Sequence, residues 1–141
     1  MKRKASARWS GGLKDGRGTI TTDSKVLSDT QYSFSTRFEN GIGTNPEELI
    51  AAAHAGCFAM ALSGQLGAAG LTAQSIDATA TVTLDKTDAG FTITDVQLDV
   101  VARIPGAQAD AFNSAATKAK EGCPVSRVLK ANITMNARLE A

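Results

Sequence analysis

Hydrophobic and polar residues alternate with period two in the first part of the chain, over residues 5–38. Ala7 and Trp9 alternate with polar residues, and β-branched or aromatic residues recur over 18–22 and 32–38. Such alternation turns one face of a strand toward a core and the other toward solvent. The pattern therefore predicts two or three strands joined by tight turns.

A longer β-hairpin is predicted in the second half of the chain. Residues 76–84 alternate strictly between apolar and polar or small side chains, and 85–90 have the composition of a turn. Residues 91–104 continue the alternation with one break near Asp95, and 133–139 alternate again. We therefore expect a hairpin followed later by a final strand.

The central part of the chain has helical periodicity instead. Asn45 suits an N-cap, Pro46 suits the first helical position, and Glu48 stands three residues after the cap, as in a capping box. Apolar and small residues follow at helical spacing to about Gly67 or Gly70. A helix this poor in charge is expected to be buried on most faces, within the fold or at a subunit interface.

Two further helices are predicted near the end of the chain. Residues 107–121 are rich in alanine, with Gly122 as the expected stop, and a short helix is expected over 123–130. Together with the strands, this order predicts an α+β fold. The length of 141 residues predicts one domain, residues 1–141.

Charge and hydropathy narrow the function classes. The 15 Lys and Arg residues against 14 Asp and Glu residues give a net charge of +1, which argues against a nucleic-acid-binding protein. From the sequence we expect no apolar stretch of the roughly 18–20 residues that a membrane span needs, and the basic N-terminus has no apolar run behind it. We therefore expect a cytoplasmic protein that contacts no membrane.

The two cysteines are the main candidates for chemistry. In a reducing compartment Cys57 and Cys123 are either inert core residues or redox-active thiols, rather than a structural disulfide. Cys123 stands at the expected N-cap of the short helix, where free N–H groups and the helix dipole stabilise a thiolate. On local electrostatics alone, Cys123 is therefore the thiol with the lower expected pKa.

The single histidine is a weak candidate for chemistry. His54 stands three residues before Cys57, but no second His or Cys pair completes a tetrahedral zinc site, so no metal site is predicted. A cysteine nucleophile with His54 as its base is conceivable. His54 has no evident orienting partner in the sequence, which weakens that hypothesis.

Arg37 and Glu47 form a further candidate pair. Arg37 is expected near the end of an apolar strand, facing solvent unless it has a partner, and Glu47 favours the first turn of the long helix. If the two meet near Cys57, the guanidinium would stabilise a thiolate and the carboxylate would hold the guanidinium in place.

Several motifs bear a specific resemblance to a known family. They are Arg-Phe-Glu at 37–39, Gly-Thr-Asn-Pro-Glu-Glu-Leu-Ile and the continuation through Cys57 at 43–62, Ser-Ile-Asp at 75–77, and Gly-Cys-Pro-Val-Ser at 122–126. With these motifs the chain resembles, from Trp9 to Leu139, the osmotically inducible protein C (OsmC) branch of the OsmC/Ohr peroxidases.

The resemblance implies a fold, an activity and site residues. It implies an OsmC-like intertwined homodimer, with a long central helix flanked by β-sheets and two active sites at the interface. The implied activity is reduction of organic hydroperoxides and hydrogen peroxide, with Cys57 peroxidatic, Cys123 resolving, and Arg37 and Glu47 activating. It needs no metal, haem or flavin, and it uses an external dithiol, with dihydrolipoyl groups as the implied reductant.

This assignment reverses the local electrostatic argument for Cys123. A helix-end effect is typically below ~1 kcal/mol when exposed, so an arginine beside Cys57 can outweigh it. Two other function classes stay open: a binding module for an apolar ligand and a non-catalytic stress protein. Four apolar residues could line a substrate approach, although their assignment to the core is favoured: Phe38, Ile42, Phe58 and Met60.

Overall fold

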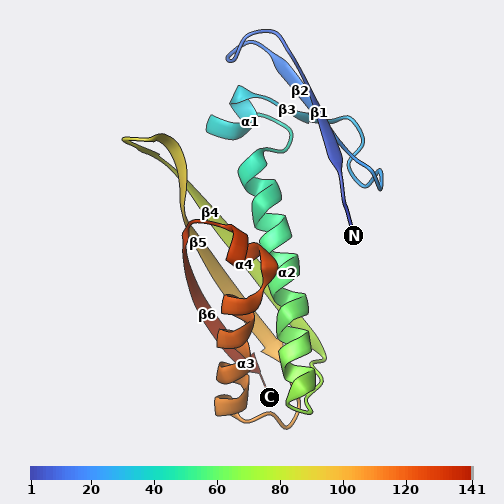
Figure 1. Cartoon of the computed structure of the whole chain (residues 1–141), viewed down its shortest axis with the longest axis vertical. Helices are drawn as coiled ribbons and strands as arrows, with labels where there is room; N and C mark the ends of the chain where they lie inside the picture. Colours follow the sequence, from blue (N-terminus) through green and yellow to red (C-terminus); the bar gives the residue numbers. More distant parts are fainter. Residues whose placement is uncertain (141) are drawn as a thin grey trace. The chain divides into compact units, whose positions relative to one another are not determined.

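The computed structural model describes residues 1–140 and divides into two compact units, residues 1–49 and 50–141. The single domain expected over 1–141 stays a prediction, and Ala141 lies outside the described residues. The mixture of helices and two small sheets confirms the α+β fold class (Figure 1).

The first unit contains a small antiparallel sheet. Its strands, in spatial order, are β1 (Ala5–Ser10), β2 (Arg17–Thr22) and β3 (Thr30–Tyr32). The rings of Trp9 and Tyr32 lie 5.5 Å apart between centroids, and both pack over Gly18. A side chain at position 18 would collide with both rings, so this strand position requires a glycine.

The expected strand over 32–38 is wrong beyond its first residue, because a short helix, α1 (Phe34–Phe38), occupies the segment. Ser33 caps it: the Thr36 N–H donates to Ser33 Oγ at 3.3 Å, and the Ser33 N–H donates to Thr36 Oγ1 at 2.8 Å. This reciprocal capping box outweighs the alternating pattern. Arg37 therefore lies in the last turn of a helix and not on a strand.

The long helix α2 (Pro46–Ala68) begins where the sequence predicts. The Glu48 N–H donates to Asn45 Oδ1 at 2.8 Å, which confirms Asn45 as the N-cap. The Glu48 carboxylate accepts from Thr44 Oγ1 at 2.8 Å. The chain leaves the helix through Gly70, whose φ of +75° is the left-handed conformation typical of a helix stop.

The second unit contains a mixed sheet. Its spatial order is β4 (Ser75–Thr87), β5 (Gly90–Arg103) and β6 (Asn132–Glu140). Strands β4 and β5 form the predicted antiparallel hairpin, and β6 pairs with β5 in parallel. The register shifts opposite Thr94, a β-bulge that confirms the predicted break near Asp95.

Helices α2 and α3 (Ala109–Gly122) cover one face of this sheet (Figure 1). Buried side chains of α2, β5 and α3 fill the space between them. The short helix α4 (Pro124–Val128) follows α3 directly and ends before the predicted Lys130, because Leu129 has extended backbone. The buried residues of this core are Phe58, Leu62, Leu66, Val96, Leu98, Val100, Ala102, Ile104, Phe112, Ala115, Ala116 and Ala119.

The face of α2 that points away from this core is exposed. Only 22% of its 18-residue apolar window is buried inside the chain, so the expected burial on most faces is not reached within one copy. By length and composition α2 could cross a membrane, contrary to the expectation from sequence, although core helices of globular proteins pass the same test. Exposed residues at helical spacing along this face include Gly56, Met60, Gly64 and Gly67.

Candidate active site

The two cysteines meet in the second unit. Cys57 lies half-buried in the middle of α2, and Cys123 lies fully buried between α3 and α4. The Cys123 thiol donates to Cys57 Sγ across 2.8 Å, and both thiols are free. A disulfide bond is about 2.05 Å long, so the sulfurs need only a small approach to become bonded.

A buried hydrogen bond connects α2 and α4. His54 Nε2 and Ser126 Oγ are 2.7 Å apart, and His54 is completely buried. The expectation that His54 lacks an orienting partner is wrong, because Ser126 is that partner. His54 precedes Cys57 by three residues and Ser126 follows Cys123 by three, and this matched spacing was the signal available in the sequence.

Burial governs the protonation of His54. Desolvation lowers the pKa of its imidazole below the ordinary value of 6.5, because the charged form loses its hydration. His54 is therefore neutral at pH 7. Its Nδ1 atom has no hydrogen-bond partner within residues 1–140, so the contact with Ser126 is its anchoring interaction.

Opposing effects act on the thiol of Cys57. Burial raises its pKa, and the contact with Cys123 raises it further, while a hydrogen bond from the backbone of Val125 lowers it. Val125 belongs to the first turn of α4, and the Cys123 side chain makes no capping hydrogen bond there. The free N–H group expected to stabilise a Cys123 thiolate is thus directed at Cys57.

Arg37 and Glu47 pair within the first unit, a contact that the sequence left conditional. Arg37 Nε donates to both Glu47 oxygens, at 3.1 and 3.2 Å, and Arg37 Nη2 donates to Oε1 at 2.7 Å. The guanidinium also lies 5.3 Å from the centre of the Phe38 ring. A fork of this kind fixes the plane of the guanidinium. The predicted action of the pair on Cys57 stays a prediction.

An apolar pocket of about 260 Å³ adjoins this pair in the first unit. Arg37 contributes its one formally charged side chain. The other lining residues are Trp9, Leu13, Tyr32, Ser33, Phe34, Phe38 and Pro46.

The four apolar candidates from the sequence have different positions. Phe58 is completely buried in the core, whereas Ile42 and Met60 are exposed, so neither of these two is a core residue of the single chain. Only Phe38 of the four lines the apolar pocket.

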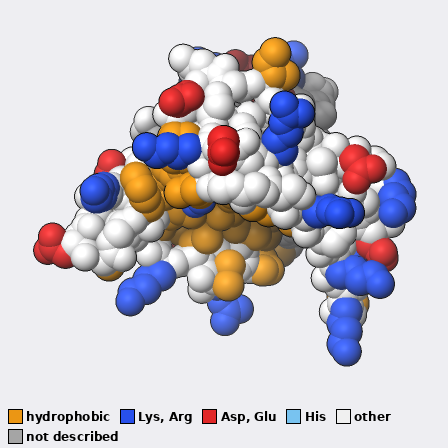
Figure 2. Space-filling model, turned by 90° about the horizontal axis from the view of Figure 1, so that it is seen from above, with side chains coloured by type: hydrophobic (Ala, Val, Ile, Leu, Met, Phe, Trp, Pro, Cys, Tyr) orange, Lys and Arg blue, Asp and Glu red, His pale blue; other side chains and the backbone are white. Residues whose placement is uncertain are grey.

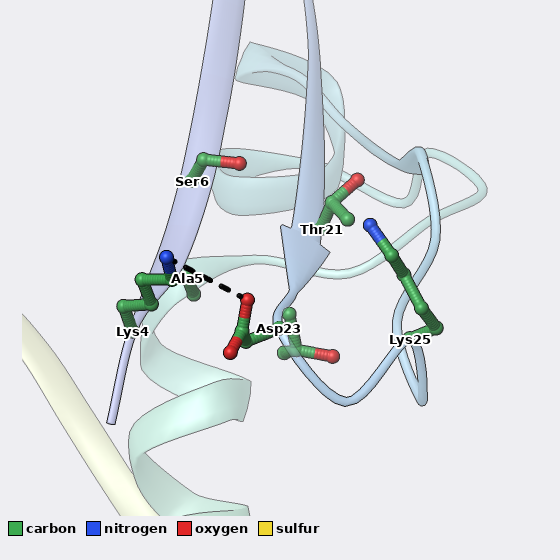
Figure 3. Close-up of a pocket in the computed structure, with 7 residues that line it drawn as sticks. Lys4, Ala5, Ser6, Thr21, Asp23 and Lys25 are labelled. Carbon is green, nitrogen blue, oxygen red and sulfur yellow. Dashed lines mark ion pairs between the residues drawn. The ribbon is translucent and has the colours of Figure 1, made fainter. Parts of the chain in front are cut away.

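A second pocket contains none of the predicted site residues. Lys4, Asp23 and Lys25 are among its lining residues, and Figure 3 shows their side chains around it. The Lys4–Asp23 ion pair spans 3.9 Å between exposed side chains and contributes little stability. Neither a thiol nor a buried charge makes this pocket reactive.

Metal ligands and charge patches add no further candidate. Within residues 1–140 no group of three or more His, Cys, Asp or Glu side chains is placed to hold a metal ion. On the face seen in Figure 2, basic and acidic side chains are interspersed.

The fold and the thiol geometry together define a class. Two free cysteines, 66 positions apart in sequence, have their sulfurs 2.8 Å apart, one on α2 and the other at the N-cap of α4, in an α+β protein. The molecule is therefore a two-cysteine thiol protein whose two sulfurs are in contact.

Comparison with known proteins identifies the family. The model of the family "OsmC-like protein" matches residues 38–138, and the chain belongs to this family. The chain is 55% identical over 141 residues to Peroxiredoxin OsmC of Escherichia coli (strain K12), covering 100% of this chain and 99% of that protein. It is 28% identical over 124 residues to the organic hydroperoxide resistance protein OhrB of Bacillus subtilis (strain 168), covering 87% and 89%.

Solved structures agree with this assignment. The crystal structure of OhrB from Bacillus subtilis matches with a TM-score of 0.71 and 26% identity, covering 99% of this chain and 98% of that chain. An OsmC-like protein from Mycoplasma pneumoniae matches with a TM-score of 0.78 and 16% identity, covering 100% and 99%. The second match shows the shared fold alone.

Proposed function

We propose that this protein is a thiol-dependent peroxidase that reduces organic hydroperoxides, and hydrogen peroxide, through a two-cysteine cycle in defence against oxidative stress. The observation that carries the proposal is the 2.8 Å contact between the Cys57 and Cys123 sulfurs. Membership of the OsmC-like family and 55% identity to a peroxiredoxin support it.

The cycle begins at Cys57. Its thiolate attacks one peroxide oxygen, the O–O bond breaks, and the leaving oxygen takes a proton to become an alcohol or water. Cys57 is left as a sulfenic acid. Cys123 is the buried partner and Cys57 the half-buried one, which supports Cys57 as the thiol that meets the peroxide.

Cys123 then resolves the sulfenic acid. Its sulfur bonds to Cys57 Sγ, the S–O bond breaks, and the departing hydroxyl takes the Cys123 proton to become water. The disulfide must afterwards be reduced by an external dithiol through thiol–disulfide exchange, which returns two thiols. Dihydrolipoyl groups are the proposed reductant, on the strength of the family resemblance.

Arg37 and Glu47 have proposed roles as the activating pair. The guanidinium would lower the pKa of Cys57, against the rise that burial causes, and Glu47 would hold the guanidinium in position. The two hydrogen-bonding nitrogens of Arg37 on one carboxylate support this role, because they leave little rotational freedom.

The apolar pocket beside Arg37 supports organic hydroperoxides as substrates. Its lining is mostly aromatic and aliphatic, which favours an alkyl or aryl group over water. The relative OhrB is named for resistance to organic hydroperoxides, in line with this choice.

We also propose that the protein is an intertwined homodimer in the cytoplasm. The exposed apolar face of α2 supports a second copy as its cover, since few soluble proteins leave so apolar a helix exposed.

The same apolar pocket favours a second candidate, a binding module for an apolar ligand. Turnover of an organic hydroperoxide with a dithiol separates the two. Cys57→Ser should abolish turnover, because only a thiolate combines sufficient nucleophilicity with a stable sulfenic product. Full turnover by this variant would leave the ligand-binding module as the better explanation.

A further inference from the structure

One buried hydrogen bond connects α2 and α4 beside the two sulfurs. His54 Nε2 and Ser126 Oγ are 2.7 Å apart, and both side chains are buried. His54 precedes Cys57 by three residues on α2, so the two lie on the same helix face, and Ser126 is the third residue of α4 after its N-cap, Cys123. Helix α2 is therefore joined to α4 and its N-cap by two contacts, one between sulfurs and one between polar groups.

We propose that His54 and Ser126 are positioning residues for the resolving step, and that their hydrogen bond keeps Cys123 in reach of Cys57 once Cys57 is a sulfenic acid. The inference rests on the proposed two-cysteine cycle. It assigns a role to a buried histidine and serine that take no part in the bond-making steps of that cycle.

The need for such a contact arises when Cys57 is oxidised. The 2.8 Å approach of Cys123 Sγ to Cys57 Sγ belongs to the reduced state, and the added oxygen of a sulfenic acid disturbs it. Helix α4 has five residues, far fewer than an isolated helix needs to be stable. Its position therefore depends on its contacts with neighbouring elements.

The hydrogen bond between His54 and Ser126 involves no reacting atom. Oxidation of Cys57 alters neither of its two groups, so it can fix the distance that the oxidised sulfur contact no longer fixes. Correct placement of one reacting group beside another raises the rate of their reaction strongly.

The chemistry links this placement to protection of the enzyme. The Cys57 sulfenic acid either condenses with the Cys123 thiol, releasing water, or meets a second peroxide, whose oxygen converts it irreversibly to the sulfinic acid. The ratio of the two rates sets the peroxide concentration at which Cys57 is overoxidised. If Cys123 is held less firmly beside Cys57, condensation slows and that concentration falls.

The buried polar pair of His54 and Ser126 can be replaced without loss of the fold. His54 Nδ1 has no partner within residues 1–140, so the pair is incompletely satisfied. Replacing both members of a buried hydrogen bond by apolar groups is often neutral or stabilising. The double variant His54→Leu/Ser126→Ala can therefore keep the fold while removing the directional contact.

The test compares overoxidation in four variants with the wild type, using graded cumene hydroperoxide. Mass spectrometry measures, for each dose, the fractions of Cys57 in the disulfide with Cys123 and in the sulfinic acid. Ser126→Ala removes the hydroxyl, Ser126→Thr keeps it, and Ser114→Ala makes the same change on the exposed side of α3. The fourth variant is His54→Leu/Ser126→Ala.

We expect the dose for half-overoxidation to fall by about three- to tenfold in Ser126→Ala, as for the loss of one buried hydrogen bond. The dose should fall equally in the double variant, because its two substitutions remove the same single hydrogen bond. Ser126→Thr and Ser114→Ala should stay near the wild-type dose. In a Cys123→Ser background, Ser126→Ala should change the rate of sulfenic acid formation less than it changes the overoxidation dose, because only the Val125 contact of α4 bears on the first step. A general structural defect would change both alike.

Two results would overturn the inference. One is an unchanged overoxidation dose in the folded Ser126→Ala protein or in the folded double variant, while the wild type forms its disulfide; the proposed function would then stand without the positioning role. The other is a wild-type protein that forms no disulfide between Cys57 and Cys123 at any dose. That result would contradict the proposed cycle, and the positioning role with it.

Discussion

A leucine in place of Gly64 should have opposite effects on a single copy and on a dimer. Gly64 lies on the exposed face of α2, and a Cβ atom placed there meets no atom of the chain within 4 Å. In a single copy, Gly64→Leu should raise the free energy of unfolding by about 0.5–1 kcal/mol, because glycine is a poor helix former.

In the proposed homodimer, the same leucine would lie in an interface. Overpacking costs about 1–3 kcal/mol at each site, and a symmetric dimer carries the substitution twice. A total of about 2–6 kcal/mol raises the dissociation constant by at least about 30-fold. Light scattering after size-exclusion chromatography measures the change, with thermal unfolding at several protein concentrations as a second readout.

Thr117→Leu is the matched control, since it places a leucine on the exposed side of α3. We expect a dimeric wild type, a dimeric Thr117→Leu and a largely dissociated Gly64→Leu. A Gly64→Leu protein that stays dimeric at every concentration would show that this face of α2 is not the interface. A monomeric wild type, stabilised by Gly64→Leu, would refute the dimer itself.

Three further predictions concern the thiols and the histidine. Arg37→Met should raise the pKa of Cys57 and slow its alkylation at pH 7 by about tenfold, and Glu47→Gln should slow it less. If the alkylation rate of Arg37→Met depends on pH as in the wild type, Arg37 does not act on Cys57. Cys123→Ser should consume about one equivalent of peroxide and then gain ~32 or ~48 Da on the Cys57 peptide with excess oxidant, and the pattern inverts if Cys123 is the attacking thiol. Because burial lowers the pKa of His54, its neutral form contributes stability above about pH 6.5 that is lost as pH falls through the lowered value. Between pH 7 and pH 5, His54→Gln should therefore lose less of its free energy of unfolding than the wild type. Equal slopes of that free energy against pH in the two proteins would contradict this.

Local patterns predict most elements of this fold. The cap at Asn45, the start of α2 and the bulge near Asp95 depend on neighbouring residues, so the sequence contains enough information to locate them. Helix α1 was missed because residues 32–38 also alternate with period two. The capping box of Ser33 and Thr36 decides between the two structures, and Thr in place of the usual Glu or Gln weakens that signal.

The site depends on contacts that local patterns do not contain. Cys57 and Cys123 are 66 positions apart and His54 and Ser126 are 72 apart, so only the packing of α4 on α2 brings them together. The expected thiolate-stabilising N–H group of α4 exists, but packing directs it to Cys57. Reasoning from one helix end therefore does not show which thiol the packing brings to that N–H group.

The central claim is that Cys57 and Cys123 form a disulfide in response to peroxide. Its most direct measurement counts free thiols, under denaturing conditions, before and after one equivalent of cumene hydroperoxide. We expect two thiols per chain before treatment and none after it, with the Cys57 and Cys123 peptides linked and one equivalent of alcohol released. Two free thiols after treatment, with the hydroperoxide unconsumed, would contradict it.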